Sequence, residues 1–383
     1  MRPAHGNAAG LMAAGFALTA VAYGLARFAY GLLLPQIRAE LALGTVTAGW
    51  IGSTGFATYC AGIMAAFVAV PRLGARAVAL AAGLCATTGL ALAAIALSPP
   101  LLGGAIALAG LSTGLASPPL AATVAHHVPV AGRSRANGAI NAGTAAGIVL
   151  SGLAVLVFTA AWRELYLAFA AIGAAVTLWL WRVMPGKASE GFLAGCLSMR
   201  VPGLAPLCIA AAIMGAASTA IWTFGADILR EQLGFSDRRI AAAWIVLGAT
   251  GLAGVATGLG TDRFGIAAVH RMSLALMGVA LGCLAVAQCA AFLPFAAMGL
   301  FGTGYIVSSG ALLLWGVTLF PERADMGLGL PFLMIAAGQT AGAPLFGSLL
   351  KTAGTPAALA VAAGLMVCAA IAIPRPVHAD MRR

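Results

Sequence analysis

Charged residues are scarce in this sequence. Asp, Glu, Lys and Arg make up only 8% of the 383 residues, whereas a soluble domain contains ~25%. Hydrophobic residues make up 62%, and the mean hydropathy is +1.01. No soluble fold could bury this much apolar surface. The composition therefore excludes a soluble protein and predicts one that crosses a bilayer many times.

The motifs of several enzyme and pump classes are also absent. There is no HExxH, no phosphate-binding P-loop and no dinucleotide fingerprint, which argues against a metalloprotease and an ATP-driven pump. Residues 110–114 read G-x-S-x-G, as in serine hydrolases, but they lie in an apolar run rather than at a strand–turn–helix elbow. No ring of charges or filter loop of a channel is visible. We therefore expect no enzyme activity, no cofactor and no metal site.

Paired cysteines and basic patches are missing as well. The seven cysteines are scattered without a CxxC pair, which favours small core residues over a metal site or disulfides. The net charge of +11 comes from Lys and Arg in short segments between apolar runs, not from a basic patch interleaved with aromatic residues. This pattern is typical of membrane topology and argues against a nucleic-acid partner.

What the sequence does contain is long apolar runs. A span needs ~20 apolar residues, and twelve runs are about that length or longer. We expect an all-α polytopic protein, in which a central cytoplasmic loop at 185–203 separates an N-terminal six-helix bundle at 1–184 from a C-terminal one at 204–383. The expected spans are residues 9–34, 48–70, 77–97, 101–125, 136–158, 164–184, 204–228, 240–260, 266–290, 293–319, 326–350 and 356–374.

The distribution of Lys and Arg predicts the orientation. If the N-terminus is cytoplasmic, fourteen of the 21 basic residues fall inside, six fall outside, and Arg27 lies within the membrane. Cytoplasmic loops carry the excess of basic residues, so we expect both termini inside. The first apolar run is too long for a cleaved signal peptide, and we interpret it as an uncleaved first span in the cytoplasmic membrane.

Matching landmarks in the two halves indicate an internal repeat. Residues 71–74 and 38–41, which follow the second and first spans, recur at 262–265 and 230–233, with offsets of 191 and 192. Both halves begin on the same side of the membrane, so the repeat is parallel. Such repeats are a signature of secondary transporters, in which the substrate site lies between the halves near the bilayer midplane.

One of these landmarks carries a known motif. Residues 258–265 read GLGTDRFG, or G-x-x-x-D-R-x-G, and resemble the loop motif of the major facilitator superfamily, which latches helices in the outward-facing state. The first-half copy keeps an arginine and a glycine but has Pro71 where the family has Asp. The resemblance implies the twelve-helix fold of that superfamily. It also implies gating roles for Arg72, Gly74, Gly258, Asp262, Arg263 and Gly265.

The end of the first apolar run carries a second resemblance. Residues 24–35 read GLARFAYGLLLP, which is similar to the first-helix signature G-x-x-R-F-A-Y-x-x-L-L-P of the YbfB/YjiJ-type transporters within that superfamily. This match implies a fold and a class, but it brings no defined substrate.

Arg27 is the most informative residue of that stretch. An arginine in mid-membrane costs ~2.5–3.5 kcal/mol, so it either faces a wet cavity or extends its side chain to the interface. Thr19, Tyr23, Arg27 and Tyr30 share one helix face. A guanidinium offers paired hydrogen bonds to a carboxylate or phosphate, which suits a cavity wall. An aromatic belt at the outer interface is the alternative, and it explains Tyr30 better than Tyr23.

Other polar residues in the apolar runs are further candidates. Asp227 lies near the outer end of the seventh run, and we expect it to be a solvated helix end. The alternatives are a partner of Arg27 and a carrier of the coupling proton. Asn141 and Thr144 either bond a neighbouring helix or face the cavity. His126 and His127 fit a hydrated helix end better than a proton switch. The candidate substrate-binding residues are Tyr23, Arg27, Tyr30, Asn141, Thr144, Trp222, Thr223, Asp227, Tyr305 and Gln339.

Together these features predict a secondary active transporter that moves a small organic anion or zwitterion by alternating access. Its expected partners are a small-molecule substrate and the lipid bilayer. A coupling proton is supported only through Asp227 or a histidine. We expect a monomer. An exporter of hydrophobic drugs and a transporter-like sensor without flux are the alternatives.

Overall fold

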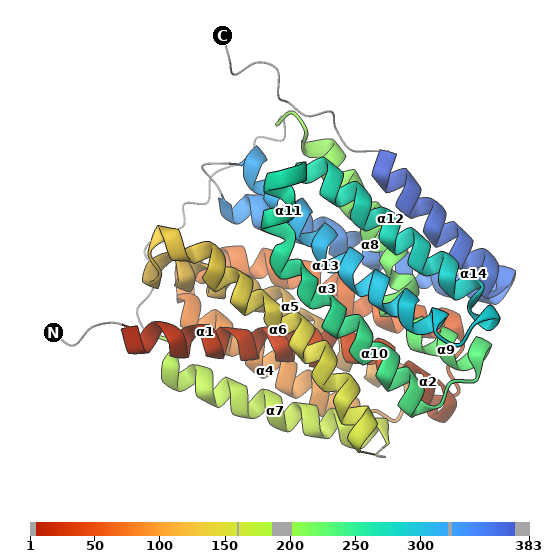
Figure 1. Ribbon diagram of the computed structural model, residues 1–383. Coiled ribbons are helices and arrows are strands. Elements are labelled where there is room, and N and C mark those ends of the chain that lie inside the picture. The colour runs from red at the N-terminus through yellow and green to blue at the C-terminus, as the bar shows by residue number, and fades with distance from the viewer. Residues whose placement is uncertain (1–4, 159–160, 186–200, 321–323, 372–383) are drawn as a thin grey trace, which may run out of the picture.

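The computed structural model describes residues 5–158, 161–185, 201–320 and 324–371, and every regular element within them is helical. The long helices run alongside one another, so that segments from all parts of the chain form one bundle (Figure 1). Their bounds are α1 His5–Thr19, η1 Ala20–Phe28, α2 Ala29–Leu41, α3 Thr45–Leu73, α4 Ala75–Ala94, α5 Pro99–His127, α6 Val130–Val157, α7 Trp162–Val183, α8 Leu204–Trp222, α9 Gly225–Leu233, α10 Asp237–Gly251, η2 Leu252–Ala256, α11 Thr257–Phe264, α12 Ile266–Ala285, η3 Ala287–Cys289, α13 Leu293–Leu319 and α14 Ala324–Ile371.

The predicted spans correspond to helices of the structure. Eleven helical segments of the described chain are long and apolar enough to cross a membrane. The last, within α14, consists of two helices joined at Gly354, whose φ of 77° and ψ of 171° are not helical. The all-α fold with twelve spans is therefore confirmed. The boundary expected at 185–203 lies mostly outside the described residues, and the division into two bundles stays a prediction.

The backbone repeats at the landmarks that the sequence matched. Gly74 follows α3 with φ 84° and ψ 155°, and Gly265 follows α11 with φ 82° and ψ 154°. Both positive φ angles favour glycine. Ala42 and Gly234, which follow α2 and α9, are both left-handed, and each donates its N–H to the carbonyl oxygen four residues earlier. The parallel repeat is therefore visible in the local conformation of both halves.

Three helix boundaries differ from the expectation. The first span runs past residue 34 and through Pro35 to Leu41, because membrane helices tolerate proline where neighbouring groups satisfy the backbone. The seventh span breaks after Trp222 and resumes at Gly225. The motif at 258–265 is not a loop, since all but its last residue belong to α11.

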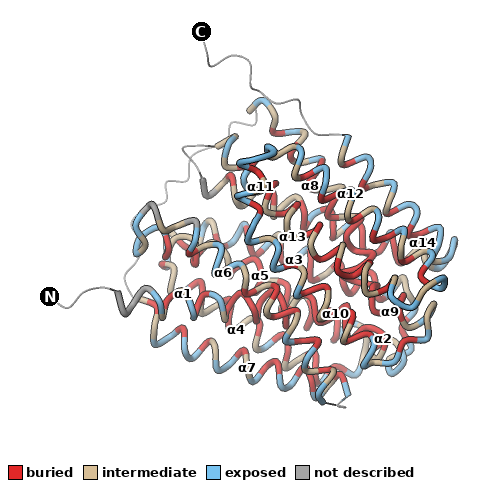
Figure 2. The backbone as a smooth tube through the Cα atoms, in the orientation of Figure 1, coloured by how far each residue is buried: buried red, intermediate tan, exposed pale blue. Residues whose placement is uncertain are grey.

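The burial pattern is that of a protein surrounded by lipid. Buried residues line the contacts between helices, and exposed residues occupy the outward faces of peripheral helices such as α7 and α12 (Figure 2). Large apolar side chains are exposed there, among them Met272 and Val279 of α12. In water such a surface would be unfavourable, whereas in a bilayer it is the solvated surface.

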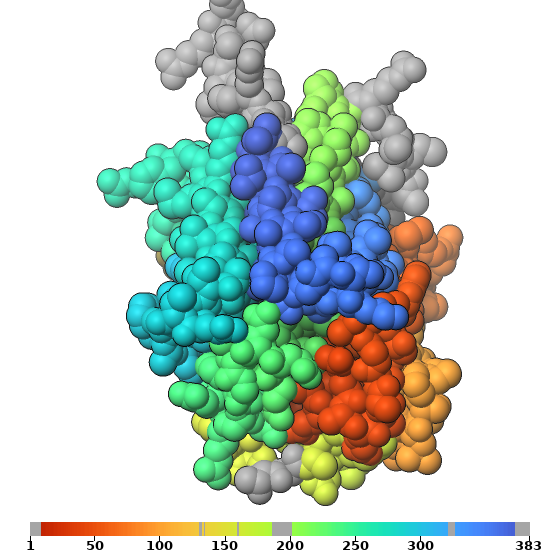
Figure 3. Space-filling view, turned by 90° about the vertical axis from the view of Figure 1, so that its right-hand side faces the viewer, coloured from red at the N-terminus to blue at the C-terminus, as the bar shows by residue number. Residues whose placement is uncertain are grey.

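The two halves are joined at the end of the bundle that holds Arg38 and Asp227, called here the Arg38 end, where the Arg38 guanidinium pairs with the Asp227 carboxylate. Segments from both halves of the sequence lie against one another on the face turned to the viewer in Figure 3. Ser53 Oγ of α3 donates to the carbonyl oxygen of Thr340 in α14 at 2.6 Å. The Arg38 end is therefore closed.

Closure at this end depends on backbone packing. A Cβ atom added to Gly31 would meet the carbonyl oxygen of Trp222 in the other half, well inside contact distance. A Cβ atom added to Gly49 would meet the carbonyl oxygen of Ala343 in the same way. Helices can approach this closely only where a side chain is missing.

Candidate functional site

The candidate site begins with an irregular turn of the first span. Residues Ala20–Phe28 form the π-helix η1, in which each N–H bonds the carbonyl five residues back. Thr113 of α5 donates its hydroxyl to the carbonyl oxygen of Ala22 at 2.9 Å, and the backbone of Gly24 packs on that of Gly147. Neighbouring helices thus support the irregular segment, and Arg27 lies in its last turn.

The seventh span is discontinuous opposite this segment. Helix α8 ends at Trp222, and α9 begins at Gly225. Between them, Thr223 and Phe224 have φ angles of −100° and −113°. Broken helices of this kind form substrate sites in many transporters, because the freed backbone groups line a cavity. The two irregular segments come from opposite halves of the chain. Phe28 of η1 stacks on Trp222 at the end of α8, and Gly31 of α2 packs on the backbone of Trp222.

The guanidinium of Arg27 is surrounded by aromatic rings. Its carbon Cζ lies 4.3 Å from the ring centroid of Tyr59, 4.9 Å from that of Phe28, 5.3 Å from that of Phe56 and 5.8 Å from that of Tyr23. All four distances are within the range of cation–π attraction. The side chain as a whole is partly buried. Aromatic faces therefore stabilise a charge that apolar residues alone would expel.

A hydrogen-bonded chain joins Arg27 to the other half of the protein. Arg27 Nη2 donates to Gln339 Oε1, and Gln339 is fully buried. Gln339 Nε2 in turn donates to Ser218 Oγ at 3.1 Å and to Tyr305 OH at 3.4 Å. No carboxylate of the described residues forms an ion pair with Arg27. The partner of this cation is a neutral amide.

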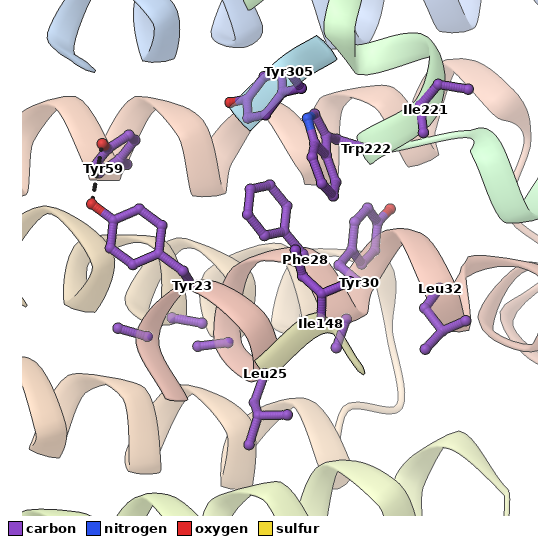
Figure 4. Packing of buried hydrophobic residues seen from close by; sticks show 14 of the residues in the cluster. Tyr23, Leu25, Phe28, Tyr30, Leu32, Tyr59, Ile148, Ile221, Trp222 and Tyr305 are labelled. Carbon is purple, nitrogen blue, oxygen red and sulfur yellow. Dashed lines mark hydrogen bonds between the residues drawn. The ribbon is translucent and has the colours of Figure 1, made fainter. Parts of the chain in front are cut away.

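A small cavity adjoins Arg27 between the two halves. Its volume is ≈ 10 Å³, about what one water molecule needs. Phe28 and Trp222 stack beside it with ring centroids 4.0 Å apart, and Tyr305 lies edge-on to Trp222 (Figure 4). The cavity is lined by Ala26, Arg27, Tyr30, Gly52, Gly55, Phe56, Ile106, Gly110, Trp222 and Thr223.

Three polar atoms at this site are buried without a hydrogen-bond partner in the described part of the chain. They are Arg27 Nε, Trp222 Nε1 and Thr223 Oγ1. A buried polar group without a partner costs ~1–3 kcal/mol, and such groups are rare in folded proteins. All three residues line the cavity beside Arg27.

The remaining candidates are divided between this site and other places. Tyr23 lies at its edge, with its hydroxyl 2.8 Å from Ser117 Oγ and 3.4 Å from Tyr59 OH. Tyr30 lines the cavity and donates its hydroxyl to the carbonyl oxygen of Ala48. Asn141 is exposed and Thr144 is half-buried, and neither lines the cavity. The structure thus brings seven of the ten candidates together, which are Tyr23, Arg27, Tyr30, Trp222, Thr223, Tyr305 and Gln339.

Asp227 departs from the preferred expectation. It is not a solvated helix end, since only 3% of it is exposed, and it does not pair with Arg27. Its carboxylate binds the guanidinium of Arg38 from the other half. The expectation failed because α9 is a separate helix that packs on α2, and no local pattern reveals that contact.

Phe56 is the aromatic residue of the cavity that was not predicted from the sequence. It lies one helical turn from Gly52 and one residue from Gly55, and all three line the cavity. A phenylalanine among apolar residues carries no signal of its own. The small residues at 52 and 55 on the same helix face were the available hint, because they permit close approach.

The gating candidates do not join the halves in this structure. Asp262 and Arg263 are exposed, and Arg263 lies over its own neighbour Phe264 at 5.3 Å. Arg72 donates to the carbonyl oxygen of Val68 in its own helix. A Cβ atom added to Gly258 or Gly265 would meet nothing within 4 Å, and the gating roles, including that of Gly74, stay predictions. His126 and His127 are both exposed, as expected of a hydrated helix end.

Comparisons with known proteins place this geometry in context. The sequence profile described as Major Facilitator Superfamily matches residues 16–330. No curated protein sequence matches the chain. The fold is similar to that of a D-xylose–proton symporter, with a TM-score of 0.80 and 13% sequence identity over 95% of this chain and 97% of that one. It is also similar to that of the nucleoside transporter NupG, with a TM-score of 0.74 and 15% identity over 95% of this chain and 97% of that one. A third similar structure is the human organic anion transporter MFSD10, with a TM-score of 0.68 and 16% identity over 98% of this chain and 100% of that one. At these identities the likeness concerns the fold alone.

Proposed function

The chain belongs to the major facilitator superfamily, and on that basis we propose that it is a secondary active transporter of a small organic anion. It is an integral membrane protein with many spans and a transporter fold rather than an enzyme. The observation that carries the anion proposal is Arg27. This cation lies between the two halves and has a neutral amide where a counter-ion would be expected. An anionic substrate would supply the missing charge.

Transport would proceed by alternating access. The two halves would rock about the cavity beside Arg27 and open it to one side of the membrane at a time. In this structure the Arg38 end is closed by the Arg38–Asp227 pair and by backbone contacts. The motif at 258–265 would join the halves at the opposite end in the other state, as the family resemblance implies.

Further details of the proposal rest on the sequence alone. The excess of Lys and Arg in the segments assigned to the inside supports cytoplasmic termini. A monomer in the cytoplasmic membrane is part of the proposal. Residues 24–35 support membership of the YbfB/YjiJ-type group. A zwitterion is the less favoured substrate, because no carboxylate of the described site residues is available for its ammonium group.

Flux measurements test the proposal. Purified protein in proteoliposomes with an imposed pH gradient is assayed with pooled organic anions and pooled hydrophobic cations. We expect anion flux in the wild type and a loss of at least ~30-fold in Arg27→Ala, because a buried charge contact is worth ~2–5 kcal/mol. Arg238→Ala, which removes an exposed arginine, is the matched control and is expected to transport normally.

Each other outcome favours a named alternative. Flux of cations that is indifferent to Arg27 would support an exporter of hydrophobic drugs, which the aromatic walls of the cavity would also suit. Absence of any flux would contradict the transporter proposal and favour a sensor. Dependence of anion flux on the pH gradient would identify a proton as the coupling ion.

A further inference from the structure

The contacts of Arg27 and the walls of its cavity narrow the class of substrate, an inference that rests on the proposed anion transport. The first constraint is charge. Among the described residues that line the cavity, Arg27 alone is charged. The carboxylate of Asp227, whose side chain is 5% exposed, is already paired with Arg38. One cation without a counter-ion balances one negative charge, which favours a monoanion over a dianion or a phosphate ester.

The second constraint is hydrogen bonding. The three unpartnered atoms include two N–H donors, Arg27 Nε and Trp222 Nε1, and a hydroxyl, Thr223 Oγ1. Trp222 is 2% exposed and Thr223 is 1% exposed, so solvent does not satisfy them. The group that completes this site must accept hydrogen bonds and carry the negative charge. A carboxylate has two oxygens that accept bonds and matches the fork of a guanidinium.

The third constraint is the shape and polarity of the walls. Tyr30, Phe56 and Trp222 present aromatic rings, and Gly52, Gly55 and Gly110 present bare backbone. The cavity of ≈ 10 Å³ has to widen before a ligand of this size enters, and a flat ring could then stack on these aromatic faces. Apart from Arg27, only Thr223, Tyr30 and Trp222 carry side-chain polar groups. A sugar or nucleoside, whose many hydroxyls each need a partner, would leave them unsatisfied here.

The fourth observation fixes where the carboxylate would bind. In this structure Gln339 Oε1 accepts the hydrogen bond of Arg27, while Gln339 Nε2 donates to Ser218 Oγ and Tyr305 OH. An amide oxygen and a carboxylate oxygen accept hydrogen bonds in the same geometry. We propose that the site binds a monocarboxylate carried on a flat apolar body, such as an aromatic acid, and that its carboxylate replaces Gln339 as the partner of Arg27.

A ligand series tests the substrate class on the purified full-length protein. Binding is measured by calorimetry and by the shift in melting temperature, because uncharged benzoic acid crosses bilayers unaided and would obscure flux. Benzoate is expected to bind. Benzamide lacks the charge, benzylamine reverses it, and phthalate doubles it. Each is expected to bind at least ~30-fold more weakly, since loss of a buried charge pair costs ~2 kcal/mol or more. Cyclohexanecarboxylate keeps the charge but not the flat body, and is expected to bind more weakly than benzoate.

Substitutions at Gln339 test the replacement step. Gln339→Glu puts a permanent carboxylate beside Arg27, so it should reduce benzoate binding ~100-fold or more without lowering the melting temperature. Gln339→Ala removes the competing acceptor, so it should tighten benzoate binding ~2–10-fold, the value of one hydrogen bond. A merely structural role of Gln339 would instead weaken binding in both variants. Gln288→Glu, the same change at an exposed position, is the control.

Two results would overturn the inference. One is equal binding of benzoate and benzamide, or no binding of benzoate at all. The other is benzoate binding by Gln339→Glu that equals that of the wild type. Either result combined with Arg27-dependent transport of another organic anion leaves the proposed function standing and rejects only the aromatic acid. Absence of all flux rejects the proposed function itself.

Discussion

Asp227→Ala is expected to lower the free energy of unfolding by about 3 kcal/mol or more, because it leaves the Arg38 guanidinium without its counter-ion in a desolvated contact. The side chain of Asp227 is 5% exposed and that of Arg38 is 20% exposed. Arg38 keeps only its bond from Nε to the carbonyl oxygen of Leu43. The pair spans the two halves, so its loss should also weaken closure at the Arg38 end.

Thermal unfolding of the purified variants in one detergent measures this effect. The matched control is Asp237→Ala. Asp237 pairs with Arg230, but both side chains are well exposed, so we expect a change of less than ~1 kcal/mol. The double variant Arg38→Met with Asp227→Leu removes both charges and should recover most of the stability. A melting temperature of Asp227→Ala equal to that of Asp237→Ala would show that the pair is not desolvated in the folded protein.

Gly110→Ala is expected to destabilise the protein by ~1–3 kcal/mol or more, because the added methyl group would overlap the backbone of Gly55. The atoms that it would meet are backbone atoms of Gly55, which cannot move aside as a flexible side chain could. The helices α3 and α5 would have to separate, and the cavity beside Arg27, which both glycines line, would change shape. We therefore expect lower yield, a lower melting temperature and impaired transport.

The same helix provides the control. Gly104 is exposed, and a Cβ atom there would meet nothing within 4 Å. Gly104→Ala should be neutral or stabilising by up to ~1 kcal/mol, since alanine has the higher helix propensity. The two variants make the same chemical change six residues apart. Similar melting temperatures for both would contradict the close contact between Gly55 and Gly110.

The sequence predicted those features that depend on local pattern. Twelve apolar runs gave twelve spans because a bilayer imposes length and hydrophobicity on each span separately. The turn glycines at 74 and 265 were predictable because positive φ favours glycine. The position of Arg27 beside a cavity was predictable, because a charged side chain within the membrane is costly unless it faces such a place.

Features that depend on contacts between distant helices were not predictable in this way. The π-helix at Ala20–Phe28 is supported by Thr113, which no periodicity connects to it. The pairing of Arg38 with Asp227 joins residues 189 positions apart. Gln339 was identified as a polar residue in an apolar run, but its role as the partner of Arg27 depends on which face of α14 meets η1. Only the folded arrangement supplies that information.

The closed Arg38 end has a consequence for how the protein can be engineered. Its tightest contacts are made by Gly31 and Gly49, and Gly347 approaches the carbonyl oxygen of Thr45 in the same way. Glycine has no smaller replacement, so every substitution at these positions adds atoms to the interface. Mutagenesis here can therefore act in one direction only. It can hold the interface apart, which would trap the transport cycle in a single state, but it cannot make the closed form more compact.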